Sequence, residues 1–308
     1  FLNMGAQNFD EDFLACSRLA SVPAELFKYN AGAISFVRCF ENCPQLSSIP
    51  SELFRYNTQA TDFFGCFMRC SGLASIPAEL FRYNTQARCF RRCFDHCTEL
   101  ASIPAELFRY CTQATDFSYC FNECNQLTAI PAELFKYNTQ ATDFSFCFCN
   151  CHGLTGANAI PTDLFRYNKQ AENFECCFCS CDGLSEIPTE LFKYNKQATD
   201  FSFCFYGCTG LTAIPAGLFV NNIVASNFQC SFTYCSGLTG ANAIPADLFR
   251  YTRATNFDSC FKNCTGLTSL PADLFGYNTQ ATNFSYCFYG CNQLTDIPAD
   301  LFKNNTQA

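Results

Sequence analysis

The chain has 308 residues, of which 49% are hydrophobic and 15% charged, and its formal net charge is −8. This acidic balance excludes the basic surface that nucleic-acid binding needs, and no apolar run approaches the ~18 residues of a membrane span. The hydrophobic content supports a packed core and excludes a disordered chain. The 26 cysteines are typical of an oxidising compartment, so we expect an extracellular or cell-surface location.

A proline recurs along the whole chain at intervals of 26 to 30 residues, most of them 27. Self-similarity at this period predicts a solenoid, in which each unit buries its apolar face against its neighbours. We therefore expect residues 1–308 to form a single continuous repeat array of about eleven units, itself part of a longer chain. The repeated prolines are Pro23, Pro50, Pro77, Pro104, Pro131, Pro161, Pro188, Pro215, Pro245, Pro271 and Pro298.

Each unit contains two apolar clusters separated by a short apolar run. In one unit, apolar residues three to four apart predict a short helix over 117–127, with Thr115 and Asp116 as its N-cap. The run 127–130 predicts a strand, because the isoleucine before Pro131 is biased toward extended geometry. Pro131 then opens a second brief helix, which Asn138 ends in a left-handed conformation.

These segments resemble a known repeat family. Leu-x-x-Ile-Pro-x-x-Leu-Phe, as in 127–135, looks like a leucine-rich repeat, and Phe-x-x-Cys-x-x-Leu, as in 121–127, looks like the BspA-like class of microbial surface proteins. The resemblance recurs in every unit, although the 27-residue length and the second cysteine depart from that class. It implies an α/β leucine-rich-repeat-type solenoid, curved, with short parallel strands along one face and short helical turns. It also implies a secreted or surface protein used in adhesion or partner binding.

Cysteines recur at two positions of the unit, four residues apart, and so form two columns along the array. The first unit has Asp12 in the first column but keeps Cys16 in the second. If disulfides formed within units, Cys16 would therefore have no partner. We therefore predict staples from each second-column cysteine to the next unit's first-column cysteine, beginning with Cys16 to Cys39; bridges within units and a reduced ladder stay open. The candidates are Cys16, Cys39, Cys43, Cys66, Cys70, Cys93, Cys97, Cys120, Cys124, Cys147, Cys151, Cys177, Cys181, Cys204, Cys208, Cys230, Cys235, Cys260, Cys264 and Cys287.

The thiols are densest around Cys149 and Cys179, which share one column in adjacent units. A soft-metal site is conceivable there, but the spacing matches no zinc ribbon and the two columns account for half of these cysteines. We therefore expect no metal and no cofactor, with extra disulfides or buried thiols in this region.

Surface rows and interruptions of the repeat suggest where a partner binds. An acid follows most prolines by two residues and a base follows the acid by three, which predicts local ion pairs beside a tyrosine column. Two three-residue insertions lengthen loops of the same type, and the eighth unit exchanges charge for apolar residues. Two of the three positions between the paired cysteines also vary. The binding-surface candidates are Gly156, Asn158, Gly240, Asn242, Val220, Ile223 and Val224.

The chain carries no Ser-His-Asp, Walker or HExxH pattern, and its two histidines lie beside column cysteines, so we expect no enzyme. The leading hypothesis is an extracellular or cell-surface scaffold for adhesion or for binding a protein or glycan partner. The alternative is a structural subunit that self-associates end to end into a disulfide-stabilised filament.

Overall fold

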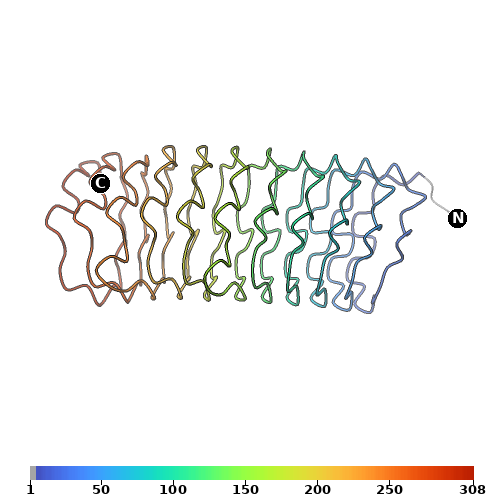
Figure 1. The fold of residues 1–308 in the computed structure, drawn as a ribbon, viewed down its shortest axis with the longest axis horizontal. Helices are drawn as coiled ribbons and strands as arrows, with labels where there is room; N and C mark the ends of the chain where they lie inside the picture. The colour runs from blue at the N-terminus through green and yellow to red at the C-terminus, as the bar shows by residue number, and fades with distance from the viewer. Residues whose placement is uncertain (1–4) are drawn as a thin grey trace.

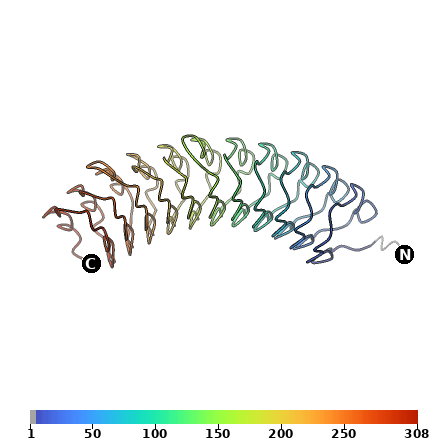
Figure 2. The same ribbon diagram turned by 90° about the horizontal axis from the view of Figure 1, so that it is seen from below.

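The structure, a computed structural model, describes residues 5–308. Figure 1 shows a row of similar coils, one per repeat unit, along which the chain advances from one end to the other. Figure 2 shows that this row is curved. The stacked coils confirm the predicted solenoid.

Regular backbone pairing between coils is limited to a ladder of single-residue parallel bridges. Within residues 5–308 no segment is a helix or a strand of several residues, so the α/β description and its short helices are wrong in detail. Ten bridges join one residue of each coil to its equivalent in the next: Asn8, Ser35, Asp62, Cys89, Asp116, Asp143, Asn173, Asp200, Asn227, Asn256 and Asn283.

The segment predicted as a helix over 117–127 is a run of tight turns stacked on its neighbours. Alternate N–H groups point to the next coil, as when Tyr119 donates to the Ser145 carbonyl at 2.8 Å. The N–H groups between them close turns within the coil, as when Cys120 donates to the Phe117 carbonyl at 3.1 Å. The bonds between coils take the place of the i→i−4 bonds of a helix, so the backbone is satisfied without helical geometry.

The bridge lies at Asp116 and not in the predicted strand over 127–130, where Leu127 instead closes a turn onto the Cys124 carbonyl at 3.1 Å. Asp116 was expected to cap a helix. Its Oδ1 does accept a backbone hydrogen bond, from the Ser118 N–H at 2.8 Å, and so opens the first turn of the ladder. The capping chemistry is as predicted, but the structure that it starts is different.

Two residues in each coil adopt positive φ, as Tyr119 (57°) and Glu123 (56°) do. Each is the third residue of a turn of type II, a position that glycine adopts most easily. Among the described coils glycine fills this position at Gly65, Gly207 and Gly290 only. Elsewhere an L-residue costs about 1–2 kcal/mol, which the bonds between coils and the packed core offset.

Gly65→Val is accordingly expected to lower the free energy of unfolding by about 1–2 kcal/mol, because a β-branched residue at φ 58° is strained. The new Cβ would also lie 3.2 Å from Cγ of Arg38. Urea unfolding midpoints would measure the effect. Met68→Val, in the same coil but at a position without positive φ, is the control, and equal midpoints for the two variants would contradict this account.

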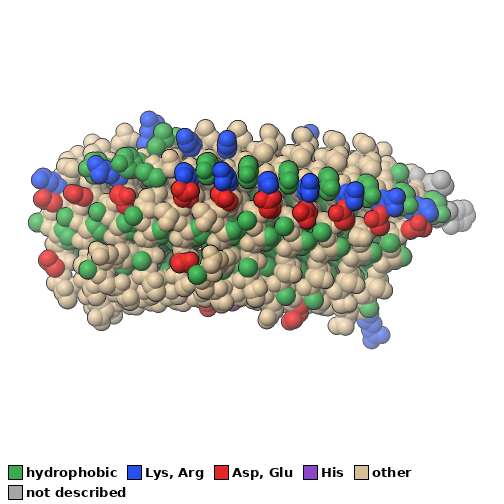
Figure 3. Space-filling view, in the orientation of Figure 1, with side chains coloured by type: hydrophobic (Ala, Val, Ile, Leu, Met, Phe, Trp, Pro, Cys, Tyr) green, Lys and Arg blue, Asp and Glu red, His purple; other side chains and the backbone are tan. Residues whose placement is uncertain are grey.

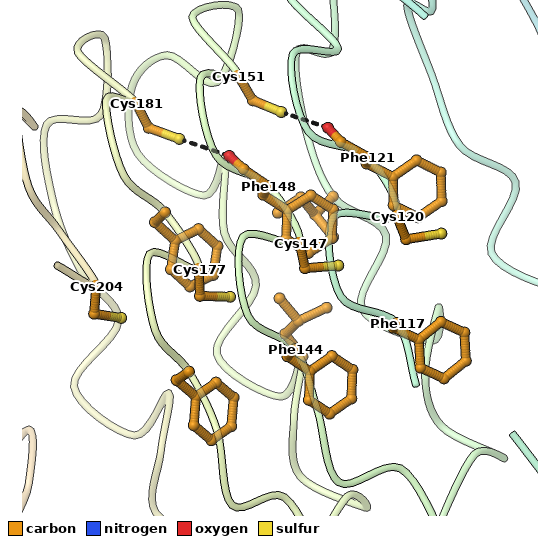
Figure 4. Packing of buried hydrophobic residues seen from close by; sticks show 14 of the residues in the cluster. Phe117, Cys120, Phe121, Phe144, Cys147, Phe148, Cys151, Cys177, Cys181 and Cys204 are labelled. Atoms are coloured by element: carbon orange, nitrogen blue, oxygen red, sulfur yellow. Dashed lines mark hydrogen bonds between the residues drawn. The ribbon is translucent and has the colours of Figure 1, made fainter. Parts of the chain in front are cut away.

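The interior consists of phenylalanine columns that run the length of the array. Equivalent rings of neighbouring coils stack, as Phe117 and Phe144 do at 5.8 Å between centroids and 8° between planes. Rings of different columns meet at steeper angles, as Phe135 meets Phe144 at 4.9 Å and 63°. All three side chains are fully buried, and Figure 4 shows the stacked rows. The repeated phenylalanines therefore form one continuous core.

The two sides of each coil stack at different spacings, which gives the curvature its direction. On the bridged side, Phe94 and Phe121 are 5.7 Å apart between ring centroids. On the opposite side, Phe108 and Phe135 are 6.2 Å apart. The array therefore bends toward the bridged side. We call the outward positions equivalent to residues 118, 119, 122 and 123 the concave face, and the segments equivalent to 131–137 the convex face.

The segment 131–138, predicted as a second helix, is also a run of turns. Leu134 donates to the Pro131 carbonyl and Asn138 to the Phe135 carbonyl, both at 3.1 Å and three residues back. Asn138 does not end a helix: it is fully buried, and its Nδ2 donates to the Cys111 carbonyl of the preceding coil at 2.8 Å. The asparagine column is thus a side-chain hydrogen-bond ladder between coils.

The convex face carries the predicted ion pairs, which are confirmed. Among the described residues eight pairs of this row lie within 4.0 Å, as Glu79 and Arg82 do at 2.8 Å. The Arg82 guanidinium also lies between two tyrosines, 5.7 Å from the Tyr83 ring centroid and 5.8 Å from that of Tyr110. Figure 3 shows the acidic and basic rows along this face. The tyrosine column therefore packs against the basic row.

Candidate binding face

The concave face is a regular lattice of side-chain positions. We number its four positions in each coil in chain order, so that residues 118, 119, 122 and 123 are the first to the fourth. The second and third positions of one coil contact each other, as Arg92 and Asp95 do at 2.7 Å between Nη1 and Oδ2. Third positions of neighbouring coils also contact, as when Asn122 Nδ2 donates to Asp95 Oδ1 at 2.8 Å. Side chains from units 27 or more residues apart in sequence therefore form one continuous surface.

Charged groups form ion pairs on this face in the second and fourth coils. Arg38 forms ion pairs with Glu11 of the preceding coil, at 2.6 Å, and with Glu41. Asp95 is fully buried and contacts Arg92 and His96, whose Nδ1 lies 2.6 Å from its Oδ1. A buried carboxylate needs such partners, because burying it unpaired would cost several kcal/mol.

Aromatic rings become frequent on this face from Tyr119 onward. Its ring stacks on Phe146 of the next coil at 4.3 Å and 4°, and the Arg92 guanidinium lies 4.0 Å from the Tyr119 ring centroid. Farther along, Tyr206 meets Tyr234 edge-on at 5.4 Å. We call this set the aromatic strip: Tyr119, Phe146, Phe203, Tyr206, Tyr234, Tyr286 and Tyr289.

The aromatic strip is accessible and has a cation beside its rings at two places. Tyr286 and Tyr289 are 64% and 62% exposed, and Lys262 Nζ lies 5.5 Å and 5.6 Å from their ring centroids. Arg92 lies on Tyr119, at the N-terminal end of the strip. Aromatic rings with adjacent cations can bind flat or apolar groups together with negative charge.

The sequence-predicted binding candidates lie elsewhere. Gly156, Asn158, Gly240 and Asn242 are exposed in the two lengthened loops, whose Gly156 and Gly240 have φ of 76° and 89°. Val220 and Ile223 are 38% and 54% exposed and Val224 is half-buried, on the convex face and the segment that follows it. The structure brings none of these seven residues onto the concave face.

The structure records all 26 cysteines as free thiols. First-column thiols from Cys39 to Cys287 are buried, with Ser231 in the column at the eighth unit. Second-column thiols from Cys43 onward each donate to a phenylalanine carbonyl of the preceding coil, at 3.0–3.4 Å, whereas Cys16 is half-buried. Cys230 is half-buried on the concave face.

The thiol hydrogen bonds run in the direction opposite to the predicted staples. Cys151 donates to Phe121 of the preceding coil at 3.1 Å, whereas its predicted partner Cys177 belongs to the following coil. Figure 4 shows the two cysteines in separate rows. The staples stay a prediction for an oxidised form of the protein, and non-reducing peptide mapping that found Cys151 linked to Cys177 would support them.

Burial in the apolar core suppresses thiol ionisation along both columns. It raises the pKa of Cys70 and of Cys151 to about 12, and that of Cys66 well above its ordinary value. Within residues 5–308 no group of three or more His, Cys, Asp or Glu side chains has the geometry to hold a metal ion. The column thiols therefore act as small core residues that also donate a hydrogen bond.

No helix in the described part of the chain is long and apolar enough to cross a membrane. In the sequence the third and fourth face positions vary, but no pattern there singles out the aromatic strip. Its stacked pair Tyr119 and Phe146 comes from different units and lies at the second face position, so that variation could have pointed only to Tyr206, Tyr234 and Tyr289.

No family model matches the sequence, and no curated protein matches it. Among solved structures, a leucine-rich-repeat protein of Leptospira interrogans is similar at 12% identity and a TM-score of 0.46, covering 91% of this chain and 72% of that one. The glycosylated Toll–Spatzle complex of Drosophila is similar at 16% identity and a TM-score of 0.44, covering 87% of this chain and 36% of that one.

A leucine-rich-repeat protein of Bacteroides ovatus is also similar, at 16% identity and a TM-score of 0.24, with 89% of this chain and 85% of that one covered. The chain thus spans about a third of the Toll chain that it matches. The solenoid assignment rests on the chain's own ladder of bridges and not on these likenesses.

Proposed function

We propose that this chain is a non-enzymatic repeat scaffold, extracellular or on a cell surface, that binds a protein partner on its concave face. The observation that carries the proposal is the contrast between the two faces. The convex face repeats the same acid, base and tyrosine in nearly every coil. The concave face changes from paired charges to the aromatic strip. A repeated row suits packing and solubility, whereas a changing surface suits recognition.

The composition of the concave face indicates the class of partner. Tyrosine and arginine are enriched at the energetic centres of protein interfaces, since they combine large apolar area with polar groups. Here the stacked Tyr119 and Phe146 lie beside Arg92, and Tyr286 and Tyr289 lie beside Lys262. This arrangement fits a segment that carries both apolar side chains and carboxylates. A glycan could also stack on the rings, and the experiment below separates the two.

The test is selection of ligands from a displayed random-peptide library and, in parallel, from a glycan array, using the reduced full chain. We expect peptides with acidic and apolar residues, and at least tenfold weaker binding by the Tyr119→Ala/Phe146→Ala variant. Tyr137→Ala, on the convex face, is the control and should bind as the parent does. Equal weakening by the control, or selection of glycans alone, would contradict the proposal.

The filament alternative stays a prediction of its own. Light scattering over a concentration series tests it, since end-to-end stacking would make the scattering mass rise with protein concentration. A mass that stays constant would count against a filament and leave the binding proposal in place.

A further inference from the structure

Three cysteines that belong to neither column lie together on the concave face: Cys149, Cys176 and Cys179. We call them the thiol triad. Along the array they lie between Phe146 and Phe203 of the aromatic strip. Cys149 and Cys176 are 4% and 6% exposed, and Cys179 is the most accessible of the three. Neither the staples nor the core requires cysteine at these positions.

Cys176 and Cys179 occupy the second and third face positions of one coil. The Cys179 N–H donates to the Cys176 carbonyl at 3.1 Å and closes a tight turn between them. The same two positions hold the Arg92–Asp95 ion pair three coils earlier. A turn of this kind keeps its end Cα atoms within about 7 Å, which is within reach of a disulfide.

Cys149 and Cys179 occupy third positions of neighbouring coils. The Asn150 N–H donates to the Cys179 carbonyl at 2.7 Å, which fixes the two coils in register at this point. Equivalent positions elsewhere are in direct contact, as Asn122 and Asp95 are at 2.8 Å. Adjacent chains in such a ladder are about 4.8 Å apart, again within the range for a disulfide. Cys179 therefore contacts two other thiols, one in its own coil and one in the preceding coil.

The hydrogen bonds around Cys179 favour its ionised form. The Cys149 and Cys176 thiols both donate to Cys179 Sγ, and these bonds lower the pKa of Cys179 against the opposing effect of burial. The same bonds, together with burial, raise the pKa of Cys149 and that of Cys176. The Ser180 hydroxyl lies 3.6 Å from Cys179 Sγ and adds a further polar contact. Of the three thiols, Cys179 is therefore the one that its neighbours favour as the thiolate.

We propose that the thiol triad is a two-electron redox site, in which Cys179 reacts with a peroxide and then forms a disulfide with Cys149 or Cys176. The Cys179 thiolate attacks the O–O bond of hydrogen peroxide, which gives a sulfenic acid and releases hydroxide. The neighbouring thiol then attacks the sulfenic sulfur as its thiolate, forms the S–S bond and expels hydroxide, and the protons of the two thiols complete two waters. In total two thiols are oxidised and one peroxide is reduced.

The chain itself offers a matched comparison. Cys230 is a half-buried thiol at the second face position of a later coil, but the third position beside it is Thr233, not cysteine. Burial raises the pKa of Cys230. Cys230 therefore shares the exposure and the face of the triad but lacks its thiol neighbours.

The experiment treats the reduced full chain at pH 7 with one equivalent of hydrogen peroxide, alkylates it over time, and maps the modified peptides by mass spectrometry. We expect Cys179 to be consumed at least about tenfold faster than Cys230, because the thiolate is the reacting species. The product should be a peptide in which Cys179 is linked to Cys149 or Cys176. Cys179→Ser should abolish the crosslink, and Cys230→Ser should leave it unchanged.

Single variants identify the partner and keep the test independent of folding. If Cys149→Ser retains the crosslink and Cys176→Ser loses it, the partner is Cys176, and the reverse result assigns Cys149; either result supports the site. Equal consumption of Cys179 and Cys230, or oxidation of Cys179 to higher acids without any crosslink, would overturn the proposal. Because the readout is covalent, the result does not depend on whether the concave face binds a partner.

Discussion

Phe144→Ala is expected to lower the free energy of unfolding by about 3–5 kcal/mol, the usual cost of removing a buried ring. The Phe144 ring is fully buried and contacts rings of three coils: Phe117 at 5.8 Å, Phe165 at 4.8 Å and Phe174 at 5.8 Å. The cavity cannot close easily, because the backbone on both sides is held by hydrogen bonds between coils. The cost should therefore fall near the upper end of that range.

The position of Phe144 adds a second effect. In a repeat array each coil is stabilised only by its neighbours, so a weakened interface near the middle lets the two halves unfold separately. We expect urea unfolding of Phe144→Ala to show an earlier and broader transition than that of the parent chain. Hydrogen exchange should be fastest in the coils that flank residue 144.

Phe146→Ala is the matched control for this prediction. It removes the same ring from the same coil, but Phe146 is half-buried on the concave face and stacks on Tyr119. Loss of a single half-buried aromatic stack should cost about 0.5–1.5 kcal/mol. Similar losses for Phe144→Ala and Phe146→Ala would show that the ring columns are not the main source of stability.

The reduced protein is expected to lose stability steeply between pH 9 and pH 12. Burial raises the pKa of Cys70 and of Cys151 from 9.0 to about 12. A thiol whose pKa is raised by folding releases its proton more readily in the unfolded chain. Its stabilising contribution is therefore fully present below the unfolded pKa and is lost as the pH rises through the folded pKa.

The expected loss is large because the effect recurs in every coil. One pKa unit corresponds to about 1.4 kcal/mol, so a thiol like that of Cys151 accounts for about 4 kcal/mol of stability lost across this window. The array should therefore unfold in an alkaline titration before the pH reaches 12. Urea midpoints at pH 7, 9, 10 and 11, in the presence of a phosphine reductant, measure the decline.

Cys151→Ser provides the control for the pH profile. Serine does not ionise in this range and can still donate to a carbonyl, as Ser231 does to Phe201 at 2.8 Å. The variant should therefore lose less stability than the parent between pH 9 and pH 11. A flat profile for the parent chain, measured without reductant, would indicate instead that the column cysteines are joined in disulfides as the sequence predicts.

The helix prediction over 117–127 failed for a specific geometrical reason. The buried positions 117, 120, 121 and 124 match one face of a helix of 3.6 residues per turn, and they also match two successive four-residue turns. Over eight residues the two periods cannot be distinguished from the pattern of apolar residues. The positive φ of Tyr119 and Glu123 distinguishes the turns from a helix. Because neither residue is a glycine, the sequence does not indicate that positive φ.

The sequence by itself determined the solenoid, its buried columns and the ion pairs of the convex face. Each of these depends on contacts within a unit or on repetition of the same residue at a fixed interval. Glu79 and Arg82 are three residues apart, and Phe117 and Phe144 are the same position of successive units. Local spacing and periodic burial are both visible in a single chain.

Only the tertiary structure decided what lies on the concave face and which thiols meet. Tyr119 reaches Phe146, and Cys149 reaches Cys179, because stacking brings together positions that are 27 and 30 residues apart. The direction of the Cys151 thiol, toward the preceding coil, was equally invisible in the sequence. These contacts depend on the register and rotation of one coil on the next, which the hydrogen bonds between coils set.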